Sequence, residues 1–132
     1  MRVFVDANVL FTAAYSPKGN AAALFESVPK LIVTSDYAAE EARRNILAKK
    51  PAGSGELERI LSRIDVAPSA PGGACPIDLP EKDRPIFMSA LKAKATHLVT
   101  GDLKDFGPRM NQPKKSAGIV IQTITDFLKG LP

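Results

Sequence analysis

The sequence has 132 residues, of which 45% are hydrophobic and 24% are charged. These proportions exclude a disordered or low-complexity chain and are typical of a globular protein, here expected as a single domain over residues 1–132. Lys and Arg number 18 against 14 Asp and Glu, and this net charge of +4 favours a polyanionic partner without requiring one.

No segment has the apolar length of a membrane span, and Asp6 interrupts the apolar start of the chain, which therefore does not fit a signal peptide. The single cysteine, Cys75, cannot form an intramolecular disulfide or a thiolate metal site by itself. We therefore expect a cytoplasmic protein with no membrane partner.

Short apolar runs of strand type alternate with segments of helical periodicity. In chain order we expect a strand over 2–5, helices over 8–15 and 19–27, a strand over 31–34, a helix from Ser35 to about Lys50, a helix over 56–64, a short strand near Val66, a helix over 83–95, strands over 97–100 and 119–122, and a closing helix that begins at Thr123. Residues 67–80, rich in proline and glycine, and residues 101–118 are expected to be loops. The alternation predicts an α/β fold with a mostly parallel sheet covered on both faces.

Two of the expected strands end in an aspartate. Asp6 follows Val3-Phe4-Val5, and Asp102 follows Leu98-Val99-Thr100-Gly101. In a parallel sheet both carboxylates lie at the edge where ligands bind, beyond the carboxyl ends of the strands. Asp83 lies in the first turn of the expected helix that leads to the second of these strands, and that helix begins at the same edge.

A fourth acid comes from the adjacent pair Glu40 and Glu41. At about 100° per residue, Glu41 borders the apolar face marked by Ala38 and Ile46, whereas Glu40 falls nearly opposite. Four carboxylates in one cleft repel one another unless protons or cations neutralise them. Oxygen ligands without His or Cys favour Mg²⁺ or Mn²⁺, so we expect one or two such ions. The expected ligands and catalytic residues are Asp6, Glu41, Asp83 and Asp102, each of which, in isolation, also fits a helix cap or a surface acid.

Other polar residues have weaker signals. Asn8 and Thr100 lie beside the acids and can orient them or a bound water, and Asp105 is either a further ligand or, as the sequence favours, a solvated loop acid. Basic clusters in the helix after Ser35 and in the loop after Asp102 could contact a nucleic-acid backbone or simply be solvated. The candidate contacts with such a backbone are Arg43, Arg44, Lys104, Lys114 and Lys115. Only 6% of residues are aromatic, so extended base stacking is not indicated.

Five short motifs occur in a fixed order along the chain. They are Asp6-Ala-Asn8-Val-Leu10, Ser35-x5-Glu41, Asp83-x-Pro-Ile-Phe-x-x-Ala-Leu, Leu-Val-Thr100-Gly101-Asp102-Leu-Lys-Asp-Phe106 and Gly118-Ile-Val-Ile-x-Thr-x-x-x-Phe127-Leu128. As an ordered set covering nearly the whole chain, they resemble the PIN-domain family, and within it the VapC-like toxin components of toxin–antitoxin pairs. The stretches 71–76 and 107–118 depart from any motif of that family.

The resemblance implies a flavodoxin-like, three-layer α/β/α sandwich and a metal-dependent endoribonuclease with an RNA substrate, a small antitoxin partner and a homodimeric state. The family's acidic set carries over onto Asp6, Glu41, Asp83 and Asp102, and its polar helpers onto Asn8 and Thr100. Hydrolysis by a metal-activated water would leave a 5′-phosphate and a 3′-hydroxyl.

Two alternative functions remain open at this stage. One is an RNA-binding or protein-interaction module on the same fold, whose acids are structural. The other is a receiver-like phosphoacceptor domain, which also places Asp at strand ends. That domain needs adjacent acids after the first strand and a Lys at a late strand end, whereas this chain has Asp6-Ala7 and Gln122 there.

Overall fold

The computed structural model describes residues 1–70 and 74–131. Its strands are β1 (Val3–Val5), β2 (Ile32–Ser35), β3 (Asp65–Ala67), β4 (His97–Val99) and β5 (Val120–Gln122). They form a parallel sheet with the order β3-β2-β1-β4-β5. Its helices are α1 (Ala7–Tyr15), α2 (Asn20–Ser27), α3 (Asp36–Lys49), α4 (Ser54–Ser62), α5 (Arg84–Lys92), α6 (Leu103–Phe106) and α7 (Ile124–Lys129), with single 3-10 turns η1 (Pro29–Leu31), η2 (Pro51–Gly53), η3 (Glu81–Asp83), η4 (Gly107–Arg109) and η5 (Pro113–Lys115).

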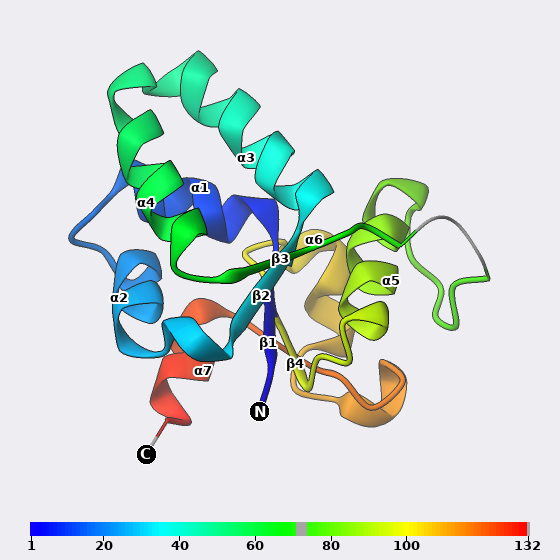
Figure 1. Ribbon diagram of the computed structural model, residues 1–132. Coiled ribbons are helices and arrows are strands. Elements are labelled where there is room, and N and C mark those ends of the chain that lie inside the picture. The colour runs from blue at the N-terminus through cyan, green and yellow to red at the C-terminus, as the bar shows by residue number, and fades with distance from the viewer. Residues whose placement is uncertain (71–73, 132) are drawn as a thin grey trace.

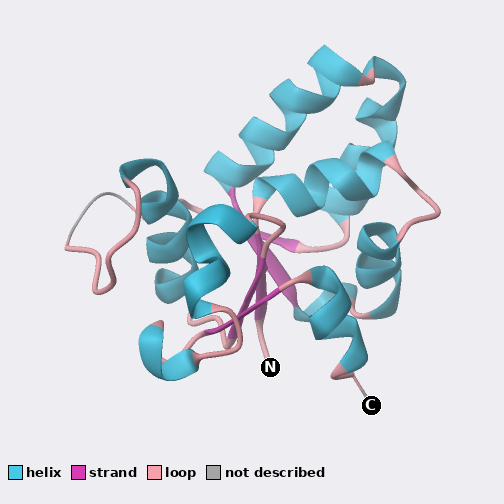
Figure 2. Cartoon of the chain, turned by 180° about the vertical axis from the view of Figure 1, so that it is seen from behind, coloured by secondary structure: helices cyan, strands magenta, loops and turns pink. Residues whose placement is uncertain are grey.

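Helices cover both faces of the sheet, as Figures 1 and 2 show from opposite sides. Helix α1 packs against α2, α3 and α4, and α2 packs against α7, so these five helices form one layer. Helices α5 and α6 lie on the other side of the sheet. The three-layer α/β/α architecture expected from the sequence is therefore confirmed, with a sheet that is parallel throughout. None of the described helices combines the length and apolar character needed to cross a bilayer.

The central strand β1 is apolar because it has strands on both sides and helices above and below it. Val3, Phe4 and Val5 are all fully buried, which is the pattern of a strand inside a parallel sheet. The edge strand β3 is more exposed, and its Asp65 pairs with Arg2 at 2.7 Å. Burial therefore falls from the middle of the sheet towards this edge.

Two expected helix starts are confirmed in detail. The Ser35 hydroxyl accepts a hydrogen bond from the Ala38 N–H at 3.0 Å, and the Thr123 hydroxyl accepts one from the Asp126 N–H at 3.1 Å. Each side chain satisfies a backbone donor that the first turn of a helix leaves free. These caps fix where α3 and α7 begin after their strands.

Replacing Ser35 by Ala is expected to lower the free energy of unfolding by about 1 kcal/mol, because α3 loses its cap. Urea unfolding followed by circular dichroism measures the change. Ser27→Ala is the matched control, since that exposed hydroxyl lies at the end of α2 and donates to Ala23 O. Equal stabilities of the two variants would contradict a capping role for Ser35.

The sequence expectation of a continuous loop over residues 101–118 is wrong. This segment contains α6 and the turns η4 and η5, because the Asp102 carboxylate accepts a hydrogen bond from the Asp105 N–H at 3.1 Å and caps α6. The helix expected over 83–95 ends earlier, at Lys92, and Lys94 adopts a left-handed conformation with φ of 57°. The expected loop at 67–80 has no helix or strand after Ala67 in its described part, and its residues 71–73 lie outside the described residues.

Candidate functional site

Asp6 and Thr100 lie where the strand order of the sheet reverses. Strand β1 continues along the chain to β2 on one side, whereas β4 pairs with β1 on the other, with Val5 opposite Val99. The Asp6 N–H donates to Val99 O at 3.2 Å, so Asp6 and Thr100 end neighbouring strands at the same level. Such a switch point is where open α/β sheets bind their ligands.

Asp6 is held by hydrogen bonds from three sides. One carboxylate oxygen accepts from the Ala7 N–H at 2.7 Å, and the other accepts from Thr100 Oγ1 at 3.0 Å and from Asn8 Nδ2 at 3.2 Å. Only 6% of the residue is exposed, and this burial raises the pKa of Asp6 although the hydrogen bonds favour its charged form. The two predicted polar helpers thus lie on the Asp6 carboxylate.

Asn8 is itself fixed by the turn after β4. Its Oδ1 accepts a hydrogen bond from the Gly101 N–H at 2.9 Å, and a Cβ at position 101 would lie only 3.2 Å from that oxygen. A side chain at position 101 would therefore push Asn8 away. Gly101 permits this close approach of two segments 93 positions apart in the sequence.

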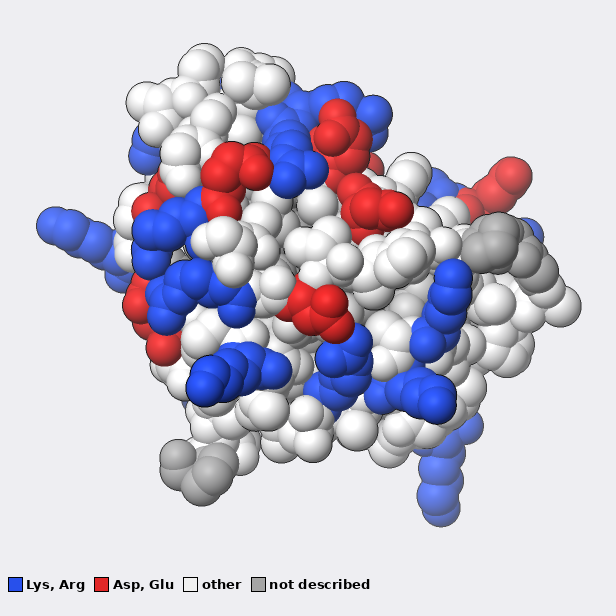
Figure 3. Space-filling model, in the orientation of Figure 1, with Lys and Arg blue, Asp and Glu red and all other residues white. Residues whose placement is uncertain are grey.

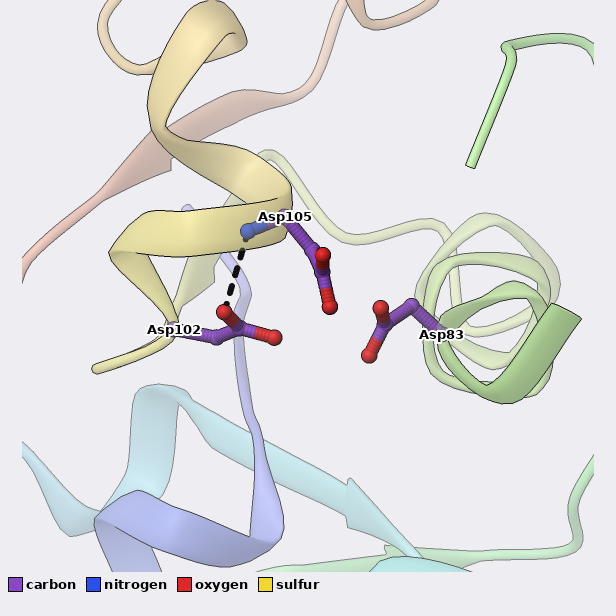
Figure 4. Close-up of side chains that lie close together, drawn as sticks. All are labelled: Asp83, Asp102 and Asp105. Carbon is purple, nitrogen blue, oxygen red and sulfur yellow. Dashed lines mark hydrogen bonds between the residues drawn. The ribbon is translucent and has the colours of Figure 1, made fainter. Parts of the chain in front are cut away.

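Three aspartates form a cluster on the other side of this turn (Figure 4). Asp83 comes from η3 at the start of α5, Asp102 caps α6, and Asp105 lies within α6. One carboxylate oxygen of each lies within 4.8 Å of the others, and the side chains of Asp83 and Asp105 point towards each other. Asp105 is therefore part of the acidic cluster, rather than the solvated loop acid that the sequence favoured.

In the described part of the chain, Asp83 is a member of the cluster with an unpartnered buried oxygen. Asp83 is 8% exposed, and within residues 1–70 and 74–131 no N–H or hydroxyl donor reaches its buried Oδ2. Burial and the neighbouring carboxylates of Asp105 and Asp102 raise the pKa of Asp83 to about 7. The ammonium of Lys82 lies beside the cluster, with its Nζ 3.2 Å from Asp105 Oδ2. An unpartnered buried oxygen among hard carboxylate ligands fits a Mg²⁺ or Mn²⁺ ion.

The four acids expected from the sequence line a single cleft of about 360 Å³. Glu41 reaches it from α3 and is half-buried, whereas Glu40 is exposed and lies 3.9 Å from Arg43 on the outer surface. Helical spacing therefore distinguished the two glutamates correctly. The complete lining is Asp6, Asn8, Phe11, Tyr37, Glu41, Asn45, Lys49, Lys82, Asp83, Ile86 and Asp102.

The basic residues expected to contact RNA do not line this cleft. Arg43 is held outside it by two hydrogen bonds of 2.9 Å to Glu58. The exposed residues Arg44, Lys104, Lys114 and Lys115 also lie outside the lining. Lys49 and Lys82 line it instead. On the face shown in Figure 3, basic side chains are spread over several elements, rather than gathered in one patch.

Metal-free protein is expected to lose stability as the pH rises from about 4 to about 7. The pKa of Asp83 in the folded chain, about 7, exceeds its ordinary value of 3.8, so in this window the folded state holds a proton that the unfolded state has released. Asp83→Asn removes the contribution of Asp83 to this decline, while Asp6, whose pKa is also raised, keeps its own. At pH 8 the substitution should raise the free energy of unfolding by about 1–3 kcal/mol.

Urea unfolding in EDTA at pH 5 and pH 8 measures this effect. At pH 5 the variant and the original chain should agree within about 0.5 kcal/mol, because both side chains are then neutral. Asp78→Asn changes an exposed acid outside the cleft and serves as the control. An equal gain at both pH values would show that the charge of Asp83 is not the cause.

Similarity to known proteins is found in the fold and not in the sequence. No family model matches the sequence, and no curated protein is similar to it in sequence. Among solved structures, VapBC2 from Rickettsia felis bound to a DNA fragment from their promoter is similar with a TM-score of 0.65 and 16% identity, over 93% of this chain and 98% of that one. VapBC-1 from nontypeable Haemophilus influenzae has a TM-score of 0.60 and 15% identity, over 95% and 99% of the two chains.

A third similar structure is VapC20 from Mycobacterium tuberculosis, a sarcin–ricin loop cleaving toxin. It has a TM-score of 0.57 and 13% identity, over 77% of this chain and 91% of that one. Because the sequence identities are this low, the similarities show the fold alone. They confirm that the chain has the fold of the VapC-like PIN proteins that its motifs resemble.

Proposed function

We propose that the chain is an endoribonuclease that hydrolyses RNA phosphodiester bonds with one or two Mg²⁺ or Mn²⁺ ions and acts as the toxin of a toxin–antitoxin pair. The observation that carries the proposal is the cluster of Asp83, Asp102 and Asp105. Asp83 and Asp102 line a cleft that Asp6 and Glu41 also line. The fold shared with VapBC complexes and with a toxin that cleaves the sarcin–ricin loop supports it.

The residues of the site have two roles in this proposal. Some would bind the ion, and others orient the ion-binding side chains. Asp83, Asp102 and Asp105 would bind an ion, and Asp6 and Glu41 line the same cleft as further ligands. Such an ion supplies Lewis-acid activation of water and neutralises charge on phosphate oxygens. Asn8 and Thr100 keep the Asp6 carboxylate in one orientation. The exposed ammonium of Lys82 lies beside the cluster and lines the cleft, where it would contact an RNA phosphate.

The test is a gel of end-labelled single-stranded RNA incubated with the purified protein in Mg²⁺, in Mn²⁺ and in EDTA. We expect cleavage with either metal and none in EDTA, with 5′-phosphate and 3′-hydroxyl ends, because water rather than the ribose 2′-hydroxyl is the nucleophile. A 2′,3′-cyclic phosphate product would contradict this mechanism. RNA binding without cleavage in all three conditions would favour the binding-module alternative.

A small antitoxin that covers the acidic cleft, a homodimeric state and a cytoplasmic location belong to the same proposal. Two of the similar structures are of VapBC assemblies, which supports a protein partner. Stoichiometric addition of the antitoxin should abolish RNA cleavage, and sedimentation equilibrium of the purified chain should give twice the monomer mass. A monomer that resists the antitoxin would contradict both assignments.

A further inference from the structure

One wall of the cleft carries side chains at intervals of one helical turn. Tyr37, Glu41, Asn45 and Lys49 all line the cleft, and each follows the previous one by four positions in α3. Side chains four positions apart lie on one face of an α-helix, about 6 Å apart along its axis. These four residues, the α3 stripe, place an aromatic ring on one side of the acid Glu41 and an amide and an ammonium on the other.

Tyr37 presents its ring at the rim of the cleft. The residue is 45% exposed although it lines the cavity, and its N–H donates to Ser69 Oγ at 3.1 Å, which fixes the first turn of α3. In the described part of the chain, neither an aromatic ring nor a cation stacks on Tyr37. An accessible ring on a helical turn whose backbone is held in this way is a platform for a nucleobase.

Lys49 presents a positive charge at the opposite end of the stripe. Its Nζ lies 5.5 Å from the centroid of the Phe11 ring, which lines the same cleft. Among the residues that the structure describes, no carboxylate pairs with Lys49, in contrast to Arg43, which Glu58 occupies. The ammonium is therefore positioned by an aromatic ring and available to a phosphate.

We propose that the α3 stripe binds a single-stranded RNA segment, with Tyr37 stacked on a nucleobase on one side of the acids and Lys49 on a backbone phosphate on the other. Asn45 lies between them and its amide contacts the intervening nucleotide. The inference rests on the proposed ribonuclease function and deepens it, because it identifies the side chains of the cleft that contact a base and a phosphate of the RNA. A duplex keeps its bases stacked within the helix and does not offer them to Tyr37.

The experiment measures RNA binding rather than cleavage. The host is the Asp83→Asn chain, which should leave the RNA intact. The probe is a fluorescein-labelled, single-stranded RNA octamer of one arbitrary sequence, and fluorescence anisotropy measures its binding. We expect Tyr37→Leu in this host to weaken binding about tenfold or more, the loss typical of one stacked base, and Tyr37→Phe to change it less than about twofold. Annealing the octamer to its complement should weaken binding by a similar factor.

An octamer that lacks its central bases tests whether the Tyr37 ring contacts a nucleobase. If Tyr37 stacks on a nucleobase, removing the central bases of the RNA weakens binding to the host but not further to the Tyr37→Leu variant. For the phosphate contact, Lys49→Gln should reduce the slope of log affinity against log salt by about 0.7, the value for one phosphate of a single strand. Lys129→Gln makes the same charge change in α7, outside the cleft, and should leave the slope unchanged.

The outcomes separate this inference from the proposed function. If the original chain cleaves RNA but Tyr37→Leu binds as tightly as the host, the inference is overturned and the ribonuclease assignment stands. If the original chain never cleaves RNA while binding depends on Tyr37 and on the bases, the stripe is supported and the ribonuclease assignment falls. A host that binds no octamer, or binds the duplex as tightly as the single strand, also overturns the inference.

Discussion

Asp102→Asn is expected to reduce RNA cleavage by about 100-fold or more while the fold is kept. The carboxylate belongs to the acidic cluster and lines the cleft, so its loss removes a charged ligand from the proposed metal site. The charge stabilisation that a bound metal supplies to the transition state is worth several kcal/mol, and each 1.4 kcal/mol corresponds to a tenfold change in rate.

The structure makes this substitution cleaner than Asp6→Asn. One oxygen of Asp102 accepts the hydrogen bond from the Asp105 N–H, and the amide oxygen of Asn can do the same, so the cap of α6 survives. At Asp6, by contrast, both oxygens accept hydrogen bonds, and an amide nitrogen would face the donors of Thr100 and Asn8. Asp6→Asn therefore changes structure as well as charge.

Two measurements check the Asp102→Asn prediction. Single-turnover cleavage of end-labelled RNA gives the rate, and calorimetric titration with Mn²⁺ gives the metal affinity. Both should fall, with an unchanged circular dichroism spectrum. Asp126→Asn makes the same chemical change in α7, outside the cleft, and should leave both values unchanged. A variant that keeps its cleavage rate would remove Asp102 from the metal site.

Phe106→Ala is expected to lower the free energy of unfolding by about 3–5 kcal/mol, the usual cost of removing a fully buried phenylalanine ring. Phe106 is 0% exposed and ends the four-residue helix α6. A helix this short is not stable by itself, so its position depends on that ring. Because Asp105 precedes Phe106 directly, the affinity for Mn²⁺ should fall together with the stability.

Leu103→Ala provides the control within the same helix. Leu103 is 60% exposed, so its truncation should change the free energy of unfolding by less than about 0.5 kcal/mol. Urea unfolding and Mn²⁺ titration of both variants measure the two effects. If Phe106→Ala loses stability but binds Mn²⁺ as the original chain does, the ring anchors the core without positioning the acids.

The parts of the site that follow strands were predictable from the sequence. Asp6 and Asp102 each come after an apolar run, and parallel pairing of β1 with β4 brings their strand ends to one edge. The choice of Glu41 over Glu40 required only the angle between successive helical residues, because α3 is long enough to have a clear apolar face.

The part built by α6 was not predictable from periodicity. Four residues are too few to show a helical pattern, so Asp105 looked like a loop acid. The one local signal is the Asp102-x-x-Asp105 spacing, which matches a side-chain cap followed by an acid in the first turn. Of the two cationic residues of the cleft, Lys49 belongs to the basic cluster that the sequence showed in the helix after Ser35. Lys82 was missed, since it reaches the cleft only through the position of η3.

The hydrogen bond between Asn8 and the turn at Gly101 has a consequence for the order in which the protein is made. The first acid of the site and its last acids are separated by about a hundred positions, and β4 must pair with β1 before they meet. A chain emerging from the ribosome therefore exposes Asp6 long before Asp102 and Asp105 exist. Under the proposed function, the acidic cluster therefore forms only after nearly all of the strands have been synthesised and paired, and RNA cleavage begins no earlier than that.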